Sequence, residues 1–154
     1  MEDKKEKYAK NLIEKSRNDI EKAGEIFKGY LPIFSNVIAL CQQSIELSAK
    51  AVFKLTGMDF PKNHEIRFEL KGTKELLKKD FPKTFQEKDK IPRLIFLTQF
   101  WKKFYELAKY GKEELNIGPD DLFGREEAEI ALKHAKEYHL IAENLEITKR
   151  TAKL

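Results

Sequence analysis

Residues 38–55, IALCQQSIELSAKAVFKL, are the most apolar helical stretch of the 154-residue chain. At about 100° per residue, five side chains fall within about 60° of Cys41 around the helix axis. They are Phe34, Ile38, Ile45, Ser48 and Val52. One continuous buried face of this kind predicts a long amphipathic helix that packs against other helices.

Two adjacent glutamines interrupt the apolar composition of this stretch. Gln43 falls almost opposite Cys41, whereas Gln42 lies at the edge of the buried face. Glu46 stands four residues after Gln42 and four before Lys50, so both pairs are spaced to interact along the helix. We interpret this polar strip as a solvent-exposed helix face.

Prolines and glycines mark where two of the helices begin and end. Pro32 and Pro92 stand where a first helical turn tolerates a missing N–H, and Gly57 and Gly111 stand where a helix ends in a residue of positive φ. This punctuation predicts helices over roughly 32–56 and 92–110.

Helical periodicity predicts two more long helices. One ends near Gly29, and the other, which is rich in alanine, spans roughly 125–149. A short helix is expected over 73–79, and no stretch alternates with the period of a strand. The sequence therefore predicts one all-α domain over residues 1–154, an antiparallel four- to five-helix up-and-down bundle.

The segment 92–110 carries apolar side chains on two faces. One stripe contains Leu94, Leu97, Trp101, Phe104 and Ala108, and a second contains Phe96, Phe100 and Leu107. A helix that is apolar on two sides is either central in its own bundle or covered by a partner. With about five helices available, we expect a homodimer.

Composition restricts the class of protein. Charged residues make up 36% of the chain, a density typical of thermophile surfaces and of long amphipathic helices. The net charge of +4 comes from residues 61–93, which fits an acidic partner such as RNA or simply a lysine-rich solvated face. A lone cysteine, Cys41, and no apolar run near the roughly 18 residues of a membrane span indicate a soluble, cytoplasmic protein without membrane attachment.

The common catalytic patterns are missing from the sequence. It contains neither a Gly-x-Ser-x-Gly turn nor a Walker-type Gly-Lys-Ser/Thr. His134 and His139 are about 140° apart on one helix and do not converge on a metal ion. We therefore expect no metal site and no cofactor.

The order of several short motifs resembles the HEPN family, the higher-eukaryote and prokaryote nucleotide-binding domains, over about residues 16–145. These motifs are SRNDIEKAGEIF, CQQSIELSAKAVFKL, PKNHEI, YELAKYG and REEAEIALKHAKEY. The resemblance implies a helical bundle that is commonly a homodimer and often encoded beside a minimal nucleotidyltransferase. Many members are ribonucleases, including toxins of toxin-antitoxin pairs, and others are binding modules.

The ribonuclease members carry an arginine followed, after four to six residues, by a histidine. Lys109 occupies the matching arginine position here, and the histidine positions hold Glu114, Leu115 and Asn116. Because cleavage of RNA without a metal needs a proton acceptor for the 2′-OH as well as a cation, we expect a non-catalytic protein.

The favoured hypothesis is a HEPN-like module that binds a nucleotide, RNA or a partner nucleotidyltransferase. Its candidate binding residues are His64, Arg67, Lys109, Tyr110 and Lys112. One alternative is a ribonuclease toxin with a divergent active site in which His64 is the base. The other is a structural dimer without a ligand.

Overall fold

The computed structural model describes residues 3–60 and 75–153. Over these residues the chain is helical and contains no β-strand, which confirms the all-α prediction. The α-helices are α1 (Lys4–Lys28), α2 (Phe34–Leu55), α4 (Ile91–Lys102), α5 (Tyr105–Tyr110), α6 (Pro119–Leu122) and α7 (Arg125–Ala152). Two 3-10 helices, η1 (Lys88–Lys90) and η2 (Glu113–Leu115), complete the set, and residues 75–77 within the segment predicted at 73–79 are also helical.

The ends of α1 and α2 follow local backbone chemistry. The Asp3 side chain accepts a hydrogen bond from the Lys5 N–H at 3.2 Å and caps the start of α1. At the end of α2, Gly57 adopts a φ of +75°, as its position in the sequence predicts.

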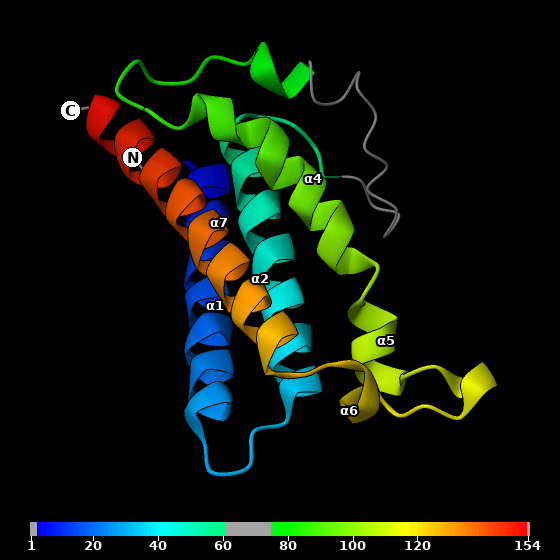
Figure 1. Cartoon of the computed structure of the whole chain (residues 1–154). Coiled ribbons are helices and arrows are strands. Elements are labelled where there is room, and N and C mark those ends of the chain that lie inside the picture. Colours follow the sequence, from blue (N-terminus) through cyan, green and yellow to red (C-terminus); the bar gives the residue numbers. More distant parts are fainter. Residues whose placement is uncertain (1–2, 61–74, 154) are drawn as a thin grey trace.

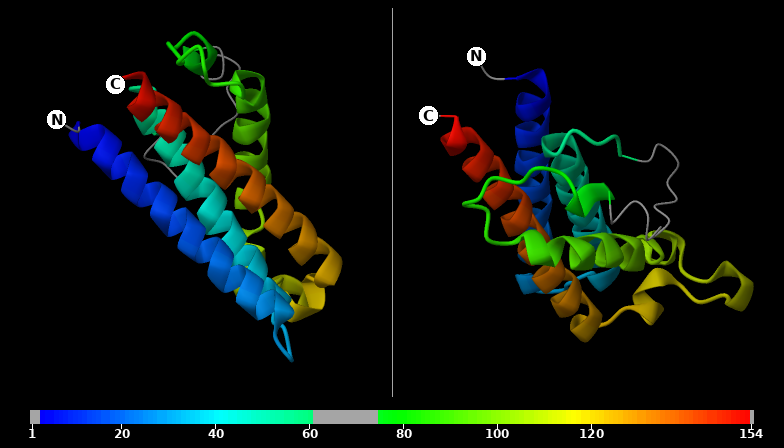
Figure 2. Two further views of the ribbon diagram at one scale, coloured as in Figure 1. Left: turned by 90° about the vertical axis from the view of Figure 1, so that its left-hand side faces the viewer. Right: turned by 90° about the horizontal axis from the view of Figure 1, so that it is seen from above.

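The four longest helices alternate in direction and form the predicted up-and-down bundle. Helices α1 and α2 form an antiparallel hairpin, α7 packs along both, and α4 lies across α2 and α7 (Figures 1 and 2). The two ends of the chain lie at the same end of the bundle, and α5 and α6 lie at the opposite end (Figure 1). Among the described residues, no helix is both long and apolar enough to cross a membrane.

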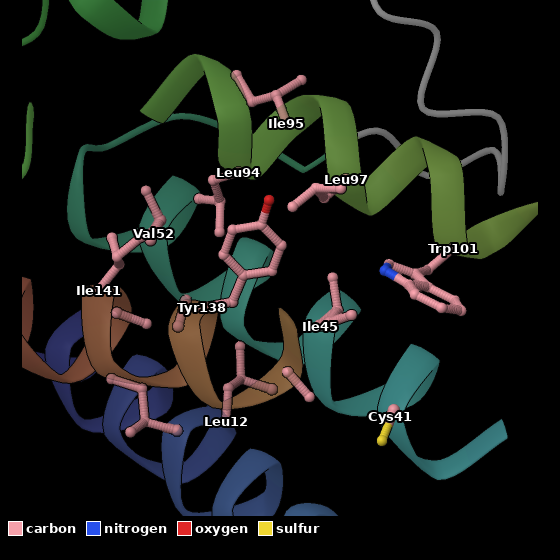
Figure 3. Packing of buried hydrophobic residues seen from close by; sticks show 14 of the residues in the cluster. Leu12, Cys41, Ile45, Val52, Leu94, Ile95, Leu97, Trp101, Tyr138 and Ile141 are labelled. Carbon is pink, nitrogen blue, oxygen red and sulfur yellow. The ribbon is translucent and has the colours of Figure 1, made fainter. Parts of the chain in front are cut away.

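The core is centred on Tyr138, whose side chain is fully buried. Figure 3 shows its ring pointing from α7 toward α4, between Leu94 and Leu97. The Tyr138 hydroxyl donates a hydrogen bond to the Arg93 carbonyl at 2.5 Å, so burying this polar group leaves no donor unpaired. Burial raises the pKa of this phenol, which stays neutral.

The predicted continuous helix over 92–110 is wrong, because the chain turns at Lys103 and Phe104. The Phe104 N–H bonds to the Trp101 carbonyl three residues back instead of continuing the α-helical pattern. Neither turn residue is proline or glycine. The break accompanies tertiary packing, in which the Phe104 ring meets Phe123 edge to face at 6.3 Å between centroids.

The two apolar stripes of this segment have different environments. In the first stripe Leu94, Leu97 and Trp101 are buried. In the second, Phe96 and Phe100 remain 54% and 38% exposed and stack on each other at 6.3 Å between centroids. Helix α4 is therefore a bundle helix with an uncovered aromatic side, not a central helix.

Candidate functional site

A pocket of about 700 Å³ lies where α4 ends and α5 begins, facing the middle of α2. The break between the two helices shapes it, because Lys102 ends α4, Lys103 lies in the turn, and Tyr105 begins α5. Its lining residues are Gln42, Gln43, Glu46, Lys102, Lys103, Tyr105 and Glu106. The pocket thus combines amides, cations, carboxylates and one aromatic ring.

The α2 wall of the pocket is held by the two predicted side-chain pairs. The Gln42 amide donates to Glu46 Oε2 at 3.2 Å, and Lys50 Nζ lies 3.3 Å from Glu46 Oε1. Gln42 is only 5% exposed, so its amide is fixed, while Gln43 beside it is exposed. The strip is solvent-exposed at Gln43, as the sequence predicts, but Gln42 is buried and residues around the α4–α5 break line the same pocket.

Helix α5 places a cation near two tyrosine rings, of which only Tyr105 lines the pocket. Lys109 Nζ lies 5.8 Å from the Tyr105 ring centroid and 5.3 Å from that of Tyr110. Tyr105 and Tyr110 are 41% and 66% exposed. A hydrogen bond with Tyr110, and then the neighbouring Tyr105, raise the pKa of Lys109, which is therefore a cation at neutral pH.

Lys112 stands apart from these residues, on a loop that begins at Gly111. Gly111 adopts a φ of +72°, and the Lys112 N–H then donates to the Ile117 carbonyl at 2.8 Å. The Lys112 side chain is exposed and does not line the pocket.

The structure therefore brings only part of the predicted site together. Lys109 and Tyr110 lie together and join the pocket through Tyr105. His64 and Arg67 lie outside the described residues.

No imidazole in the described part of the chain is free to act beside Lys109. The positions at which the ribonuclease pattern needs histidine form the exposed turn of η2 and the left-handed Asn116. His134 Nδ1 accepts a hydrogen bond from Trp101 Nε1 at 2.9 Å, and His139 is buried in the bundle.

A buried polar network around His139 is a feature that the sequence analysis missed. Ser16 Oγ lies 2.8 Å from Ser44 Oγ, 2.9 Å from Ser48 Oγ and 3.3 Å from His139 Nδ1. His139 Nε2 lies 3.3 Å from Glu143, so we infer that Nε2 carries the proton and Nδ1 accepts from Ser16.

This serine–histidine–glutamate arrangement is structural. Ser16, Ser44 and Ser48 are fully buried, so no substrate reaches the hydroxyl of Ser16. Burial lowers the pKa of His139, which keeps the imidazole neutral inside the bundle. The available signal was the spacing of small polar residues on buried helix faces, with serines four residues apart on α2.

The described residues also contain no group of three or more histidine, cysteine, aspartate or glutamate side chains arranged to hold a metal ion. The amides, lysines and tyrosine that line the α4–α5 pocket are groups that form hydrogen bonds, charge contacts and stacking contacts.

Comparison with protein families matches residues 9–145 to the HEPN domain. The chain belongs to the HEPN domain family. No match to it was found among curated proteins or among solved structures. The matched region of this HEPN domain runs from α1 into α7 and includes every residue that lines the pocket. The expected match of Lys109 to the arginine of the ribonuclease members stays a prediction, and no histidine stands at positions 114–116.

Proposed function

We propose that this HEPN domain binds single-stranded RNA at the α4–α5 edge without cleaving it. The observation that carries the proposal is the position of Lys109 near the exposed rings of Tyr105 and Tyr110, beside a polar pocket. Unpaired bases stack on exposed aromatic rings, and lysines neutralise the phosphates between them. Family membership supports a nucleotide- or RNA-related role.

We expect no cleavage because the described residues around Lys109 supply no histidine as a proton acceptor. Lys109 is charged at neutral pH and supplies only positive charge to a phosphate. Transfer of the 2′-OH proton needs a base with a pKa near neutrality, and the nearby positions Glu114, Leu115 and Asn116 hold no histidine.

RNA binding is tested by fluorescence anisotropy with a labelled short single-stranded RNA at low salt. Replacing Tyr110→Ala removes a stacking surface and weakens binding by about tenfold, because stacking contributes roughly 1–3 kcal/mol per base. A plot of log K for RNA binding against log salt concentration has a negative slope. Lys109→Ala makes this slope shallower by about 0.7, the amount expected for the loss of one phosphate contact.

The matched control is Tyr8→Ala. Tyr8 is also half exposed and also lies near a lysine, with Lys54 Nζ 6.0 Å from its ring centroid. Tyr8 belongs to the first turns of α1, which begins at the end of the bundle away from α5 (Figure 1), so its replacement leaves RNA affinity unchanged. Equal binding by the Tyr110 and Tyr8 variants, or no binding by the wild type, contradicts the proposal. RNA cleavage that is abolished by His64→Ala favours the ribonuclease alternative instead.

We also propose that the domain forms a homodimer through the outer side of α4. The support is the exposed, stacked pair Phe96 and Phe100, which a second copy would cover with the same apolar surface. In solution the expected molar mass is twice that of the 18.1 kDa chain, and Phe96→Glu with Phe100→Glu reduces it to one chain. A strict monomer in the wild type contradicts this proposal.

A further inference from the structure

The α4–α5 pocket has the size and composition of a nucleotide site. Its volume of about 700 Å³ falls within the range of roughly 300–1,000 Å³ that small-molecule sites occupy. Lysine charge from the end of α4 lies on one side, and amides and a carboxylate from α2 lie on the other. A ligand that fits both sides carries an anionic group and a polar ring edge.

Gln43 is the residue best placed to read such an edge. Its side chain lines the pocket, is exposed, and makes no hydrogen bond to the described residues. The neighbouring Gln42 is not available in the same way, because its Nε2 is already bonded to Glu46. An open glutamine amide offers one donor and one acceptor side by side, which matches N7 and the N6 amino group of adenine.

Two carboxylates also line the pocket. Glu106 belongs to α5, and Glu46 on α2 is already paired with Gln42 and Lys50. A carboxylate only accepts hydrogen bonds, so it pairs with the N6 amino group of adenine and equally with N1–H and the N2 amino group of guanine. Selection of adenine over guanine therefore rests on the pairing of the Gln43 amide with N7 and N6 of adenine.

We propose that this pocket is a subsite for an adenine base, which stacks on Tyr105 while Gln43 pairs with its N7 and N6 edge and Lys103 contacts its phosphate. The inference rests on the proposed function in that an RNA strand bound across Tyr105 and Tyr110 delivers the base. The pocket is nevertheless testable alone, because adenosine monophosphate contains every group that it recognises.

The test is isothermal titration calorimetry of the whole chain with AMP, GMP, CMP and UMP, each titrated separately. AMP binds about tenfold more tightly than GMP, the smaller end of the discrimination expected from one bidentate base contact. Gln43→Ala removes this preference. Because Gln43 is exposed on α2, its replacement by alanine leaves the helix and its packing intact.

Two further variants separate base reading from general effects. Gln86→Ala changes another exposed glutamine that does not line the pocket, and it keeps the AMP preference. Tyr105→Ala loses about tenfold in AMP affinity, because the ring on which the base stacks is removed.

The outcomes distinguish this inference from the proposed function. Equal affinity for AMP and GMP, or an AMP preference that survives Gln43→Ala, overturns the adenine subsite even when RNA binds and depends on Tyr110. An AMP preference that depends on Gln43 in a protein that binds no RNA supports the subsite and overturns the RNA-binding function.

Discussion

The seam between α1, α2 and α7 and the edge between α4 and α5 both hold polar side chains, but they use them in opposite ways. In the seam, Ser16, Ser48 and His139 bond one another away from water. At the edge, Gln43 and Lys103 face a pocket, and the rings beside Lys109 are exposed.

The difference follows from how the helices meet. Helices α1, α2 and α7 pack along one another over much of their length, so a polar group between them is stable only when another side chain pairs with it (Figure 2). The break at Lys103 and Phe104 turns α5 away from the line of α4 and leaves an opening beside α2. Paired polar groups thus stabilise the fold, and open ones are available to a ligand.

The largest effect is expected from breaking the seam network at Ser16. Ser16→Ala removes the hydroxyl that contacts both Ser48 Oγ and His139 Nδ1, and leaves buried polar atoms without a partner. Each such loss costs about 1–3 kcal/mol, so the free energy of unfolding falls by about 3 kcal/mol in urea titrations. RNA affinity of the folded variant stays unchanged, because the edge lies elsewhere.

The control for this change is Asn18→Ala, which replaces an exposed polar residue on the same helix. Its unfolding free energy stays within about 0.5 kcal/mol of the wild type. A Ser16 variant as stable as the Asn18 variant shows that the seam network contributes nothing to the fold, and removes the contrast between the two regions.

A smaller loss is expected at the edge from Gly111→Ala. The new Cβ would approach the Ile117 carbonyl oxygen to 2.2 Å at a φ of +72°, so the loop after α5 must shift. We expect a cost of about 2 kcal/mol in thermal unfolding and weaker RNA binding, because Tyr110 directly precedes the strained residue.

Gly24→Ala is the matched control for the glycine change. Gly24 lies inside α1 with no atom within 4 Å of the added Cβ, and alanine there stabilises the helix by about 0.5–1 kcal/mol. Opposite signs for the two glycine variants support a requirement for glycine at position 111, and two stabilising results contradict it.

The long helices could be predicted because their signals are local. Apolar periodicity and the positive-φ glycines Gly57 and Gly111 depend on neighbouring residues alone, and the helix ends agree with them. The break within 92–110 has no such signal, since Phe104 turns to pack against Phe123, which is distant in the sequence. Tertiary contacts therefore decided the one boundary that shapes the pocket.

Only the part of the candidate site that has local sequence signals could be predicted. Lys109 and Tyr110 stand out through their position in the family pattern, and the pairing of Gln42 with Glu46 follows from helical spacing. That the two glutamines line a pocket depends on where α4 and α5 lie, and the bond from Ser16 to His139 joins opposite ends of the chain. Residue spacing within one helix does not predict contacts between helices.

The smallest expected effect concerns Asp19, the exception within the seam region. Asp19 is 8% exposed, and its Oδ2 has no hydrogen-bond partner in the described residues. Burial raises the pKa of this carboxyl above its ordinary value of 3.8, although Lys22 and Lys15 oppose the shift. The folded state therefore binds this proton more tightly than the unfolded chain does, and stability is lost as the pH rises through the folded-state pKa. The asparagine in Asp19→Asn stays neutral, so at pH 7 the free energy of unfolding of this variant is about 1 kcal/mol larger than that of the wild type. The gain shrinks as the pH falls toward 3.8.

Urea unfolding across this pH range measures the effect, and the exposed Asp59→Asn is a control that changes little. A destabilised Asp19 variant at pH 7 would mean that the carboxylate is held by a favourable interaction, and that the seam contains no exception.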